Sequence, residues 1–293
     1  MQKQNLKTQL AAGAVLAPGV YDALSALVAE QAGFNALYLS GASIAYTRLG
    51  RSDIGLTTYT EVEDTLARIA ERVSASVIVD ADTGFGEPMN VARTVQALED
   101  AGVAGLHIED QVNPKRCGHL DGKQVVDADT ALKRIRAAVH ARRDPNLLIM
   151  ARTDIRGVEG LASAVDRAKG LVDAGADAIF PEAMKDLGEF EAIRKAVDVP
   201  ILANMTEFGK SELFTTEQLA GVGVNIVIYP VTLLRSAMGE VERTLDTIVA
   251  DGTQQAAVAG MQTRARLYEL LDYEGYNAFD SGVFNFEVPG KKG

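Results

Sequence analysis

Acidic side chains stand at the ends of two neighbouring apolar segments. Asp80 and Asp82 end the run SVIVDAD, and Glu109 ends the next apolar run. On a strand, residues two apart point to the same face, so Asp80 and Asp82 are expected to act together. Carboxylates that are buried together need a cation or become protonated. Since oxygen ligands suit Mg²⁺ or Mn²⁺ and no His/Cys cluster accompanies them, we predict a magnesium site; helix capping by the aspartates is the alternative.

Two further ionisable residues lie in apolar segments. Arg152, in the run LLIMART, offers a planar pair of donors that can bind a carboxylate in a bidentate manner. It could instead neutralise one of the acids, or do both. His107 lies two residues before Glu109 and is expected to point the same way. It could be a metal ligand, an acid or a hydrogen-bonded histidine of the core. The segment ends therefore combine acids with a carboxylate-binding cation.

The only cysteine of the chain, Cys117, lies in the polar segment QVNPKRCGH (residues 111–119). A lone cysteine rules out an intramolecular disulfide and favours a reducing, cytoplasmic setting. Lysine, arginine or protonated histidine beside a thiol lowers its pKa toward neutrality, where the thiol can exchange a proton. Single cysteines are often small buried hydrophobes. In this basic, glycine-flanked loop we predict a catalytic thiol that covers a bound substrate.

None of the strand candidates contains lysine. A Schiff-base aldolase would therefore lack its nucleophile. A carbanion formed in the site must instead be stabilised by a metal and by positive side chains. This favours metal-assisted retro-aldol chemistry, in which a carbon–carbon bond next to a hydroxyl group breaks.

A phrase that recurs along the chain predicts the elements that position these residues. A helix tail, a glycine and an apolar run follow one another in EQAGFNALYLS (30–40), EDAGVAGLHIED (99–110), VDAGADAIFPEA (172–183) and LAGVGVNIVIYP (219–230). The glycine suits the left-handed residue that ends a helix. Four more apolar runs lie between these copies, at 15–22, 76–82, 147–153 and 200–206. Strand candidates that alternate with amphipathic helices predict an α/β fold, a (β/α)8 barrel of the TIM type.

The barrel is expected over residues 1–250, followed by a C-terminal helical extension over 251–293. A doubly wound open sheet is the alternative, but no G-x-G-x-x-G follows the first strand, which also argues against a nicotinamide oxidoreductase. In a TIM barrel, catalytic groups lie at the carboxyl ends of the strands. We therefore expect the acids, Arg152 and the cysteine loop to meet at that end.

Composition restricts the partners. The net charge is −11, so the chain has no surplus of cations to displace phosphate counterions, and we expect no nucleic-acid partner. No apolar run reaches the ~20 residues that cross a bilayer, so we expect no membrane insertion. A small anionic substrate remains compatible, because a metal and a few cations in one pocket can bind it.

These motifs together resemble the isocitrate lyase/phosphoenolpyruvate mutase superfamily, and within it most closely the 2-methylisocitrate lyases. The resemblance covers essentially the whole chain, and KRCGH is typical of the lyases of this group. The motifs that carry it are YLSG (38–41), VDADTGFG (79–86), NVARTV (90–95), AGLHIEDQ (104–111), KRCGH (115–119), IMARTD (149–154), FPEA (180–183), ILANMTEFG (201–209), LFTTEQL (213–219), YP (229–230) and MQTR (261–264).

The resemblance implies which residues bind the metal and the substrate. Asp80 and Asp82 would bind Mg²⁺, for which Mn²⁺ is a possible substitute, with Asp53 and Glu109 completing the shell through water. The pyruvate part of the substrate would be held by Ser40, Gly41 and Ala42, with Arg152 on its carboxylate. The remaining substrate-binding residues would be Gly118, His119, Glu182, Asn204, Met205, Thr206, Arg235 and Arg264.

The resemblance also implies the reaction, the cleavage of 2-methylisocitrate to pyruvate and succinate. Cys117 would protonate the succinate-like carbanion, and Glu109, Arg152 and Tyr38 would complete the catalytic set. The base for the hydroxyl proton remains open among Tyr38, Glu182 and a metal-bound hydroxide. Members of the family are typically homotetramers that swap their C-terminal helices, which would explain the residues after 250.

Two departures from the family pattern bear on the substrate. Gly41-Ala42-Ser43 stands where 2-methylisocitrate lyases have three glycines, and Met205 replaces an isoleucine. The alternatives are therefore a lyase for a related 2-hydroxy acid such as 2,3-dimethylmalate, or an oxaloacetate decarboxylase, which needs no proton donor like Cys117. A catalytically silent binding barrel is a more remote alternative, because every metal acid and the cysteine are present.

Overall fold

The structure, a computed structural model, describes residues 5–119 and 122–284. The chain divides into two compact units, Met1–Ser236 and Ala237–Gly293. The first unit contains all the strands and the residues around the cysteine loop. The prediction that the barrel ends at residue 250 stays a prediction.

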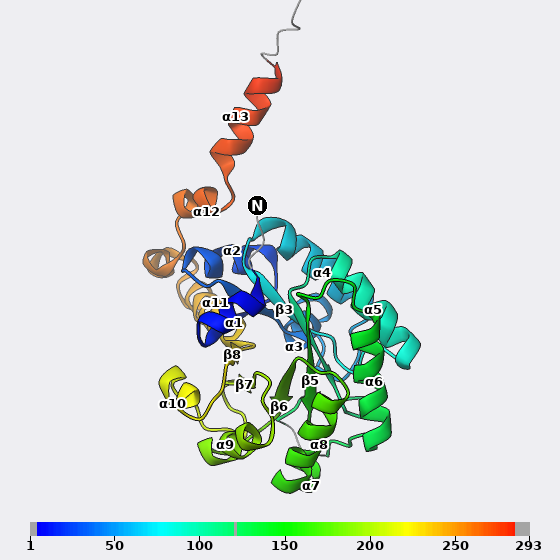
Figure 1. The fold of residues 1–293 in the computed structure, drawn as a ribbon. Coiled ribbons are helices and arrows are strands. Elements are labelled where there is room, and N and C mark those ends of the chain that lie inside the picture. Colours follow the sequence, from blue (N-terminus) through cyan, green and yellow to red (C-terminus); the bar gives the residue numbers. More distant parts are fainter. Residues whose placement is uncertain (1–4, 120–121, 285–293) are drawn as a thin grey trace, which may run out of the picture. The chain divides into compact units, whose positions relative to one another are not determined.

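Eight parallel strands form the centre of the first unit (Figure 1). Each strand pairs with its neighbours along the chain, and β1 also pairs with β8. A parallel bridge between Ile179 and Ile201 joins the remaining two edges, so the sheet closes on itself. The strands are β1 (Val15–Val20), β2 (Ala36–Leu39), β3 (Ser76–Asp80), β4 (Gly105–Glu109), β5 (Leu148–Thr153), β6 (Ala178–Pro181), β7 (Leu202–Asn204) and β8 (Ile226–Tyr229). The predicted (β/α)8 barrel is confirmed.

Helices follow the strands and surround them in Figure 1. They are α1 (Leu6–Ala12), α2 (Ala23–Gln31), α3 (Gly41–Ile44), the π-helical η1 (Ala45–Leu49), α4 (Tyr59–Arg72), α5 (Pro88–Asp100), α6 (Ala128–Ala141), α7 (Arg156–Glu159), α8 (Leu161–Asp173), α9 (Leu187–Ala196), α10 (Thr216–Gly221) and α11 (Thr232–Asp251). The sequence sets several of their first residues. Thr58 and Glu61 form a capping box on α4, and Pro88 occupies the first turn of α5.

Alternate residues of each strand fill the inside of the barrel, as the two-residue period of a strand requires. The middle of the barrel is apolar, with Tyr38, Ile78, Met150, Phe180 and Ile226 in one buried cluster. Toward the carboxyl ends the same alternation brings polar side chains inward, among them Asp80, His107, Glu109, Arg152 and Asn204. The amphipathic pattern of the strands therefore places the chemistry at one end of the core.

Helix α1 closes the amino end of the barrel. Leu6 is 1 % exposed and belongs to the central cluster. Its Cδ2 lies 3.1 Å from the point where a Cβ on Gly105 would stand, so the absence of a side chain at Gly105 makes room for it. A side chain from outside the sheet thus completes the packing of the strands.

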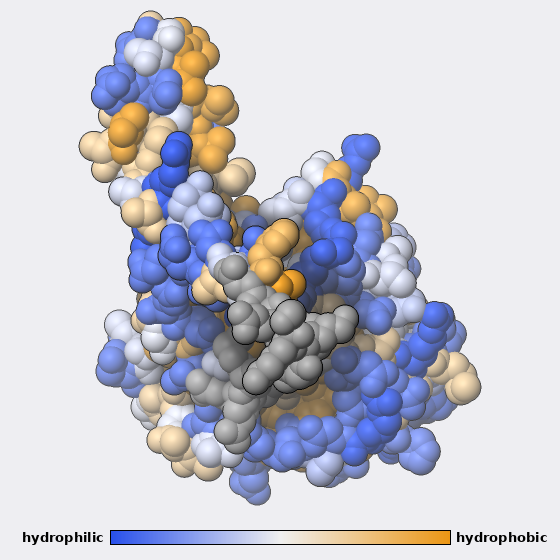
Figure 2. All heavy atoms as spheres, turned by 90° about the horizontal axis from the view of Figure 1, so that it is seen from above, coloured by the Kyte–Doolittle hydropathy of each residue, from blue (hydrophilic) through white to orange (hydrophobic). Residues whose placement is uncertain are grey.

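The second unit is helical and carries many exposed apolar side chains. After the end of α11 it contains η2 (Gln255–Gly260), α12 (Arg264–Leu270) and α13 (Tyr273–Phe284). On α13, Phe279, Val283 and Phe284 are between 59 % and 83 % exposed. Among the described residues, no helix is both long and apolar enough to cross a membrane. On the face drawn in Figure 2, hydrophilic side chains cover most of the surface and hydrophobic ones gather in smaller areas.

We expect Leu6→Ala to lower the free energy of unfolding by about 3 kcal/mol, because it opens a cavity at a buried leucine. Leu24→Ala, the same change at a residue of α2 that is 38 % exposed, is the matched control and should cost less than about 0.5 kcal/mol. Denaturant unfolding followed by circular dichroism measures both. Equal effects of the two changes would show that α1 does not complete the core.

Candidate active site

A small cavity of about 60 Å³ lies at the carboxyl end of the barrel. It is formed by the ends of six strands, the start of α11 and the loop that carries the cysteine. Its lining residues are Tyr38, Ser40, Ala42, Tyr46, Asp53, Asp80, Cys117, Gly118, His119, Arg152, Glu182, Asn204, Thr206, Pro230, Val231 and Arg235. Most of the residues predicted from the sequence therefore meet in one place.

A lysine lies between two of the predicted metal acids. The Lys115 ammonium forms ion pairs with Asp53 and, at 2.6 Å, with Asp82. Its side chain is only 2 % exposed, so the ammonium is surrounded by these acids rather than by water. Burial opposes the charge of Lys115, but Asp82, Glu109 and Asp53 outweigh it and raise the pKa of the lysine. Lys115 is thus a buried cation at the place where the sequence predicts a metal.

Asp80 lies on a strand and Asp82 lies in the turn that follows it. The prediction that both lie on one strand face is wrong. Strand β3 ends at Asp80, whose Oδ2 accepts from the Gly41 amide at 3.3 Å. Asp82 lies beyond the strand, in the left-handed region with φ 47°. Its amide donates to Asp80 Oδ1 at 3.0 Å, so a tight turn replaces the alternation of a strand.

The acids differ in their pKa values because they differ in their neighbours. Burial raises the pKa of Asp82 to about 6 despite the opposing effect of Lys115. Burial also acts on Asp80, but His107 and Lys115 together lower its pKa. The pKa of Glu109 is raised well above its ordinary value by burial. One end of the barrel therefore holds more carboxylate than it can easily keep ionised.

Glu109 is the residue whose environment most calls for an additional cation. Within residues 5–119 and 122–284, neither of its carboxylate oxygens accepts a hydrogen bond, although Oε2 lies 3.2 Å from Arg152 Nε. Over the same ranges, no three His, Cys, Asp or Glu side chains converge closely enough to form a ready-made metal site. The oxygen-only donors and the unsatisfied Glu109 fit a hard divalent cation in chemistry. In this structure the Lys115 ammonium is paired with Asp53 and Asp82, so a cation bound by Asp82 would have to displace it.

Arg152 is the centre of a buried network of ion pairs. Its guanidinium lies 2.9 Å from Asp154, 3.2 Å from Glu109 and 3.3 Å from Glu182. Burial disfavours the charge, but Asp154, Glu109 and Glu182 outweigh it and raise the pKa of Arg152 further. Both roles considered from the sequence are therefore compatible: Arg152 neutralises acids, and it also lines the cavity.

Tyr38 and His107 form a hydrogen-bonded pair below the cavity. The Tyr38 hydroxyl lies 2.8 Å from His107 Nε2, and both side chains are buried. Burial lowers the pKa of His107 to about 4, so the imidazole is neutral at pH 7. Burial also raises the pKa of Tyr38 well above 10. Of the roles considered for His107, this geometry favours the hydrogen-bonded histidine of the core.

The environment of Cys117 is not the one that its basic neighbours in sequence suggest. Lys115 is engaged with the acids, and Arg116 is exposed. Burial raises the pKa of the Cys117 thiol above its ordinary value. The prediction of a thiol pKa lowered toward neutrality is therefore wrong, because burial is the largest influence on the thiol and Lys115 is paired with acids. A thiol in this setting keeps its proton at neutral pH.

Most of the remaining residues predicted to bind the substrate form two clusters. Glu182 Oε1 lies 2.9 Å from His119 Nε2 and 3.4 Å from Asn204 Nδ2. His119 Nδ1 accepts from the Lys210 amide at 3.0 Å, so Nε2 carries the hydrogen that faces Glu182. Burial would raise the pKa of Glu182, but Arg152 and His119 lower it well below its usual range.

Thr206 and Arg235 form the second cluster. Arg235 Nη1 lies 3.2 Å from Thr206 Oγ1 and 2.8 Å from Glu207 Oε2. Met205 is buried, and its sulfur accepts from the Phe214 amide at 3.4 Å. Arg264 is the first residue of α12 in the second unit, and its predicted role in substrate binding stays a prediction.

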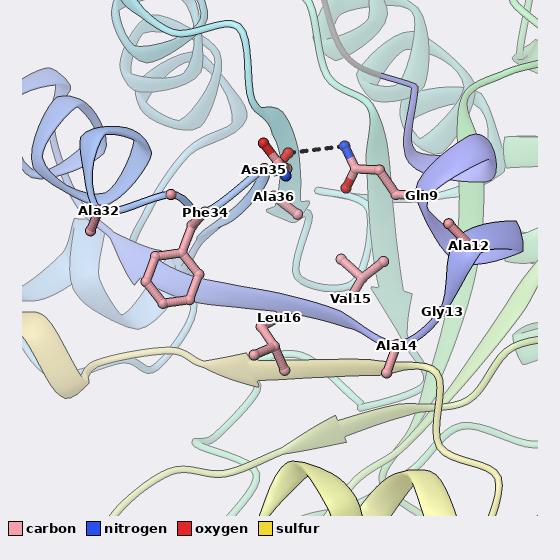
Figure 3. A pocket seen from close by; sticks show the side chains of 11 residues that line it. Gln9, Ala12, Gly13, Ala14, Val15, Leu16, Ala32, Phe34, Asn35 and Ala36 are labelled. Carbon is pink, nitrogen blue, oxygen red and sulfur yellow. Dashed lines mark hydrogen bonds between the residues drawn. The ribbon is translucent and has the colours of Figure 1, made fainter.

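A larger hollow lies at the opposite end of the barrel, at the start of β1 and β2 (Figure 3). Gln9 of α1 points toward Asn35 there, and its side-chain amide donates to the Asn35 carbonyl at 3.0 Å. Phe34, Leu16 and Val15 supply apolar walls. Its lining residues are all uncharged, so the acid–base chemistry belongs to the cavity at the carboxyl end.

Several residues of the site were not predicted from the sequence. Tyr46, Pro230 and Val231 line the cavity, but their types and spacing carry no signal of a site. Lys115 and Lys123 belong to a different group, since both pair with acids from the barrel. The imbalance between strand-end acids and strand-end cations could have indicated that lysines of the adjacent loop would compensate.

Comparison with known proteins decides the family. The profile of the phosphoenolpyruvate phosphomutase family matches residues 5–249. The chain belongs to this family. It is 55 % identical over 292 residues to "Probable 2-methylisocitrate lyase 2" of Corynebacterium glutamicum, and the matched region covers 99 % of this chain and 95 % of that protein. It is 50 % identical to the 2-methylisocitrate lyase of Aeropyrum pernix, over 92 % of this chain and 86 % of that protein. The recognition of the superfamily is confirmed, and with it an enzyme of the lyase type.

Solved structures of the family superpose along nearly the whole chain. An oxaloacetate acetylhydrolase with 3,3-difluorooxalacetate has a TM-score of 0.90 at 34 % identity, over 97 % of each chain. A 2,3-dimethylmalate lyase has a TM-score of 0.88 at 35 % identity, also over 97 % of each chain. A phosphonopyruvate hydrolase with oxalate and Mg²⁺ has a TM-score of 0.86 at 29 % identity, over 96 % of this chain and 99 % of the other. The family thus shares this barrel across several reactions.

The pairing of Lys115 with the acids generates a prediction for the metal-free protein. Lys115→Met leaves buried carboxylates without their cation, so in EDTA we expect a loss of about 3–5 kcal/mol in the free energy of unfolding. Lys195→Met, which removes an exposed ammonium paired with Glu191 at 3.0 Å, is the matched control and should be nearly neutral. Thermal and denaturant unfolding measure both. An unchanged stability of the Lys115 variant would show that this ion pair does not balance the site.

Proposed function

We propose that this chain is a Mg²⁺-dependent 2-methylisocitrate lyase that releases pyruvate and succinate. The observation that carries the proposal is a protonated, half-buried thiol, Cys117, in the same cavity as Arg152 and Glu182. This arrangement supplies a proton donor beside a carboxylate-binding cation, as the protonation of a carbanion next to carboxylates requires. The relatives that share this chain over most of its length carry the same activity in their names.

The acids at the carboxyl end fit the proposed metal. Asp80 and Asp82 would hold Mg²⁺, with Asp53 and Glu109 completing its shell through water. Bound there, the ion would stabilise the negative charge of the keto acid released. Two observations support this assignment: the donors are all oxygens, and Glu109 is buried with no hydrogen bond to its carboxylate among the described residues. The phosphonopyruvate hydrolase of the same family was solved with Mg²⁺ and oxalate.

The chain's own residues define the course of the reaction. The substrate loses its 2-hydroxyl proton to solvent, the C2–C3 bond breaks so that C2 becomes the keto carbon of pyruvate, and the bonding electrons remain on C3. The thiol of Cys117 then gives its proton to C3, which yields succinate, and the thiolate later regains a proton from solvent. Arg152 binds the carboxylate of the pyruvate half beside Ser40, Gly41 and Ala42. The raised pKa of the thiol supports a donor that is protonated before the step.

The candidates for the hydroxyl base differ in strength. The pKa of Glu182 is lowered because Arg152 and His119 outweigh its burial, so Glu182 is a weak base. Tyr38 is a buried phenol that keeps its proton at neutral pH. Both residues line the cavity, and we assign them to orienting the substrate rather than to removing its proton.

A lyase for a related acid is the second candidate. The solved 2,3-dimethylmalate lyase matches this chain with a TM-score of 0.88. Ala42, which replaces a glycine of the 2-methylisocitrate lyases, lines the cavity and reduces the space beside the pyruvate half. One methyl group changes discrimination between substrates by only about 1–3 kcal/mol. Ala42 therefore affects the choice of substrate more than it affects the type of reaction.

We also propose that the enzyme works as a cytoplasmic homotetramer without nucleic-acid or membrane partners. The exposed apolar side chains of α13, Phe279, Val283 and Phe284, support an assembly that covers them. Swapping of the C-terminal helices between subunits would serve this purpose.

The proposed function is tested by measuring pyruvate release with Mg²⁺ from 2-methylisocitrate, isocitrate, 2,3-dimethylmalate and oxaloacetate. We expect the highest kcat/KM with 2-methylisocitrate and no activity in EDTA. A higher kcat/KM with 2,3-dimethylmalate would select the second candidate. The absence of pyruvate from all four acids, with folded protein and metal, would refute a lyase of this kind.

Replacing the proton donor tests the role of Cys117. Cys117→Ser should lower kcat about 10²-fold or more, because a hydroxyl group is a far weaker acid at the same place. Cys117→Ala should lower it to the same level or below, while the unfolding midpoint of both variants stays near that of the parent chain. Turnover within twofold of the parent chain would exclude the thiol from the mechanism.

A further inference from the structure

Lys123 is a buried lysine that none of the roles above uses. Its ammonium pairs with Asp154 Oδ1 at 2.8 Å and donates to the carbonyl oxygen of Gly118. The two side chains are 3 % and 0 % exposed. A cation buried to this degree requires partners of good geometry. Lys123 has one from the barrel and one from the cysteine loop.

Asp154 connects this lysine to the centre of the cavity. The carboxylate follows β5 and binds Arg152 with both oxygens, Oδ2 to Nε at 2.9 Å and Oδ1 to Nη2 at 3.3 Å. The backbone amide of Asp154 donates to Asp110 Oδ1 at 2.8 Å, and this hydrogen bond fixes the main chain at Asp154. One buried carboxylate therefore holds both the carboxylate-binding arginine and the lysine that binds the cysteine loop.

The main chain at Gly118 lies directly against this arginine. A Cβ on Gly118 would stand 2.5 Å from Arg152 Nη2 and 2.6 Å from Glu182 Cγ. No side chain could be added there without displacing the loop. The Gly118 carbonyl that Lys123 binds thus belongs to a residue of the loop that lies against Arg152, and Cys117 is its direct neighbour in the chain.

Neutralisation of Asp154 alone does not account for these contacts. Arg152 already provides a cation at 2.9 Å, and the bond from Lys123 to the Gly118 carbonyl adds nothing to the charge balance of Asp154. The structure also makes room for the ammonium: a Cβ on Gly157 of α7 would approach Lys123 Nζ to 3.3 Å. The position of this head group is therefore defined by Asp154, the Gly118 carbonyl and the backbone at Gly157.

We propose that Lys123 is a positioning residue, which ties the main chain at Gly118 to Asp154 and so fixes the Cys117 thiol beside Arg152. The barrel carboxylate acts as the common anchor of the arginine and the loop. The importance of this position for catalysis rests on the proposed function, because there the thiol donates its proton to a carbanion held near Arg152. The positioning itself does not depend on which substrate is cleaved.

The test uses Cys117 as its own reporter, since the chain contains no other cysteine. The rate of alkylation by iodoacetamide is measured in the full-length protein without substrate, over a range of pH. The plateau at high pH reports access to the thiolate, whereas the midpoint reports the thiol pKa. For Lys123→Met we expect the plateau rate to rise about tenfold or more, because the loop is no longer held against Arg152.

Arg142→Met is the matched control. It removes a partly buried cation that pairs with Asp177 outside the cavity. A loss of stability without loss of positioning should therefore appear in this variant, with the plateau rate of alkylation unchanged. A Lys123→Met plateau within twofold of the parent chain would overturn the proposal, as would an equal rise in Arg142→Met.

Two further measurements separate the positioning role of Lys123 from a general loss of stability. Lys123→Arg retains the charge and the donors, so its plateau rate should lie closer to the parent chain than to the methionine variant, and a rate equal to that of Lys123→Met would contradict the proposal. In steady-state assays we expect Lys123→Met to lower kcat about tenfold or more with a smaller change in KM. A chain that is inactive on every acid, but shows the alkylation result, would refute the proposed lyase and leave the positioning role intact.

Discussion

The excess of carboxylates at the carboxyl end of the barrel is the constraint on which the rest of this end depends. Asp80, Asp82 and Glu109 come from the strands and the turns that follow them, where the sheet itself offers only Arg152 as a cation. Buried charges without partners are costly, so the missing cations must come from other segments. Lys115 supplies one to Asp53 and Asp82, and Lys123 adds a second cation beside Asp154, the carboxylate that also binds Arg152. Both flank Cys117 in the chain, and the balance of charge therefore draws the cysteine loop over the barrel.

This dependence also explains the state of the thiol. A loop rich in basic residues would lower the pKa of a cysteine if its charges faced the sulfur. Here Lys115 is committed to Asp53 and Asp82, and Cys117 is left in a buried setting that raises its pKa. The thiol therefore suits the donation of a proton better than nucleophilic attack. The cations of the loop position the cysteine without activating it.

The fold and the set of residues around the cavity could be predicted from the sequence because both follow from repetition. Apolar runs at regular intervals indicate parallel strands, and ionisable residues at their ends, such as Asp80 and Arg152, must then meet at one edge. The turn at Asp82, with its left-handed backbone, could not be predicted, since nothing in a D-x-D pair shows where the strand ends. The pairing of Lys115 with Asp53 joins segments 62 residues apart. Such a contact depends on the path of the loop, which the periodicity of strands and helices does not determine.

The two departures from the family pattern differ in what they can do, now that their places are known. Met205 is 2 % exposed and accepts a hydrogen bond from the Phe214 amide, so it can shape the cavity only through the residues packed on it. Ala42 lines the cavity, in the short helix that begins beside Asp80. Under the proposed function, a methyl group at this place acts beside the pyruvate half, which 2-methylisocitrate and 2,3-dimethylmalate have in common. It would therefore limit how that shared half lies in the site, whereas the choice between these two acids would depend more on the residues proposed around the other half, Glu182, Asn204 and Arg235.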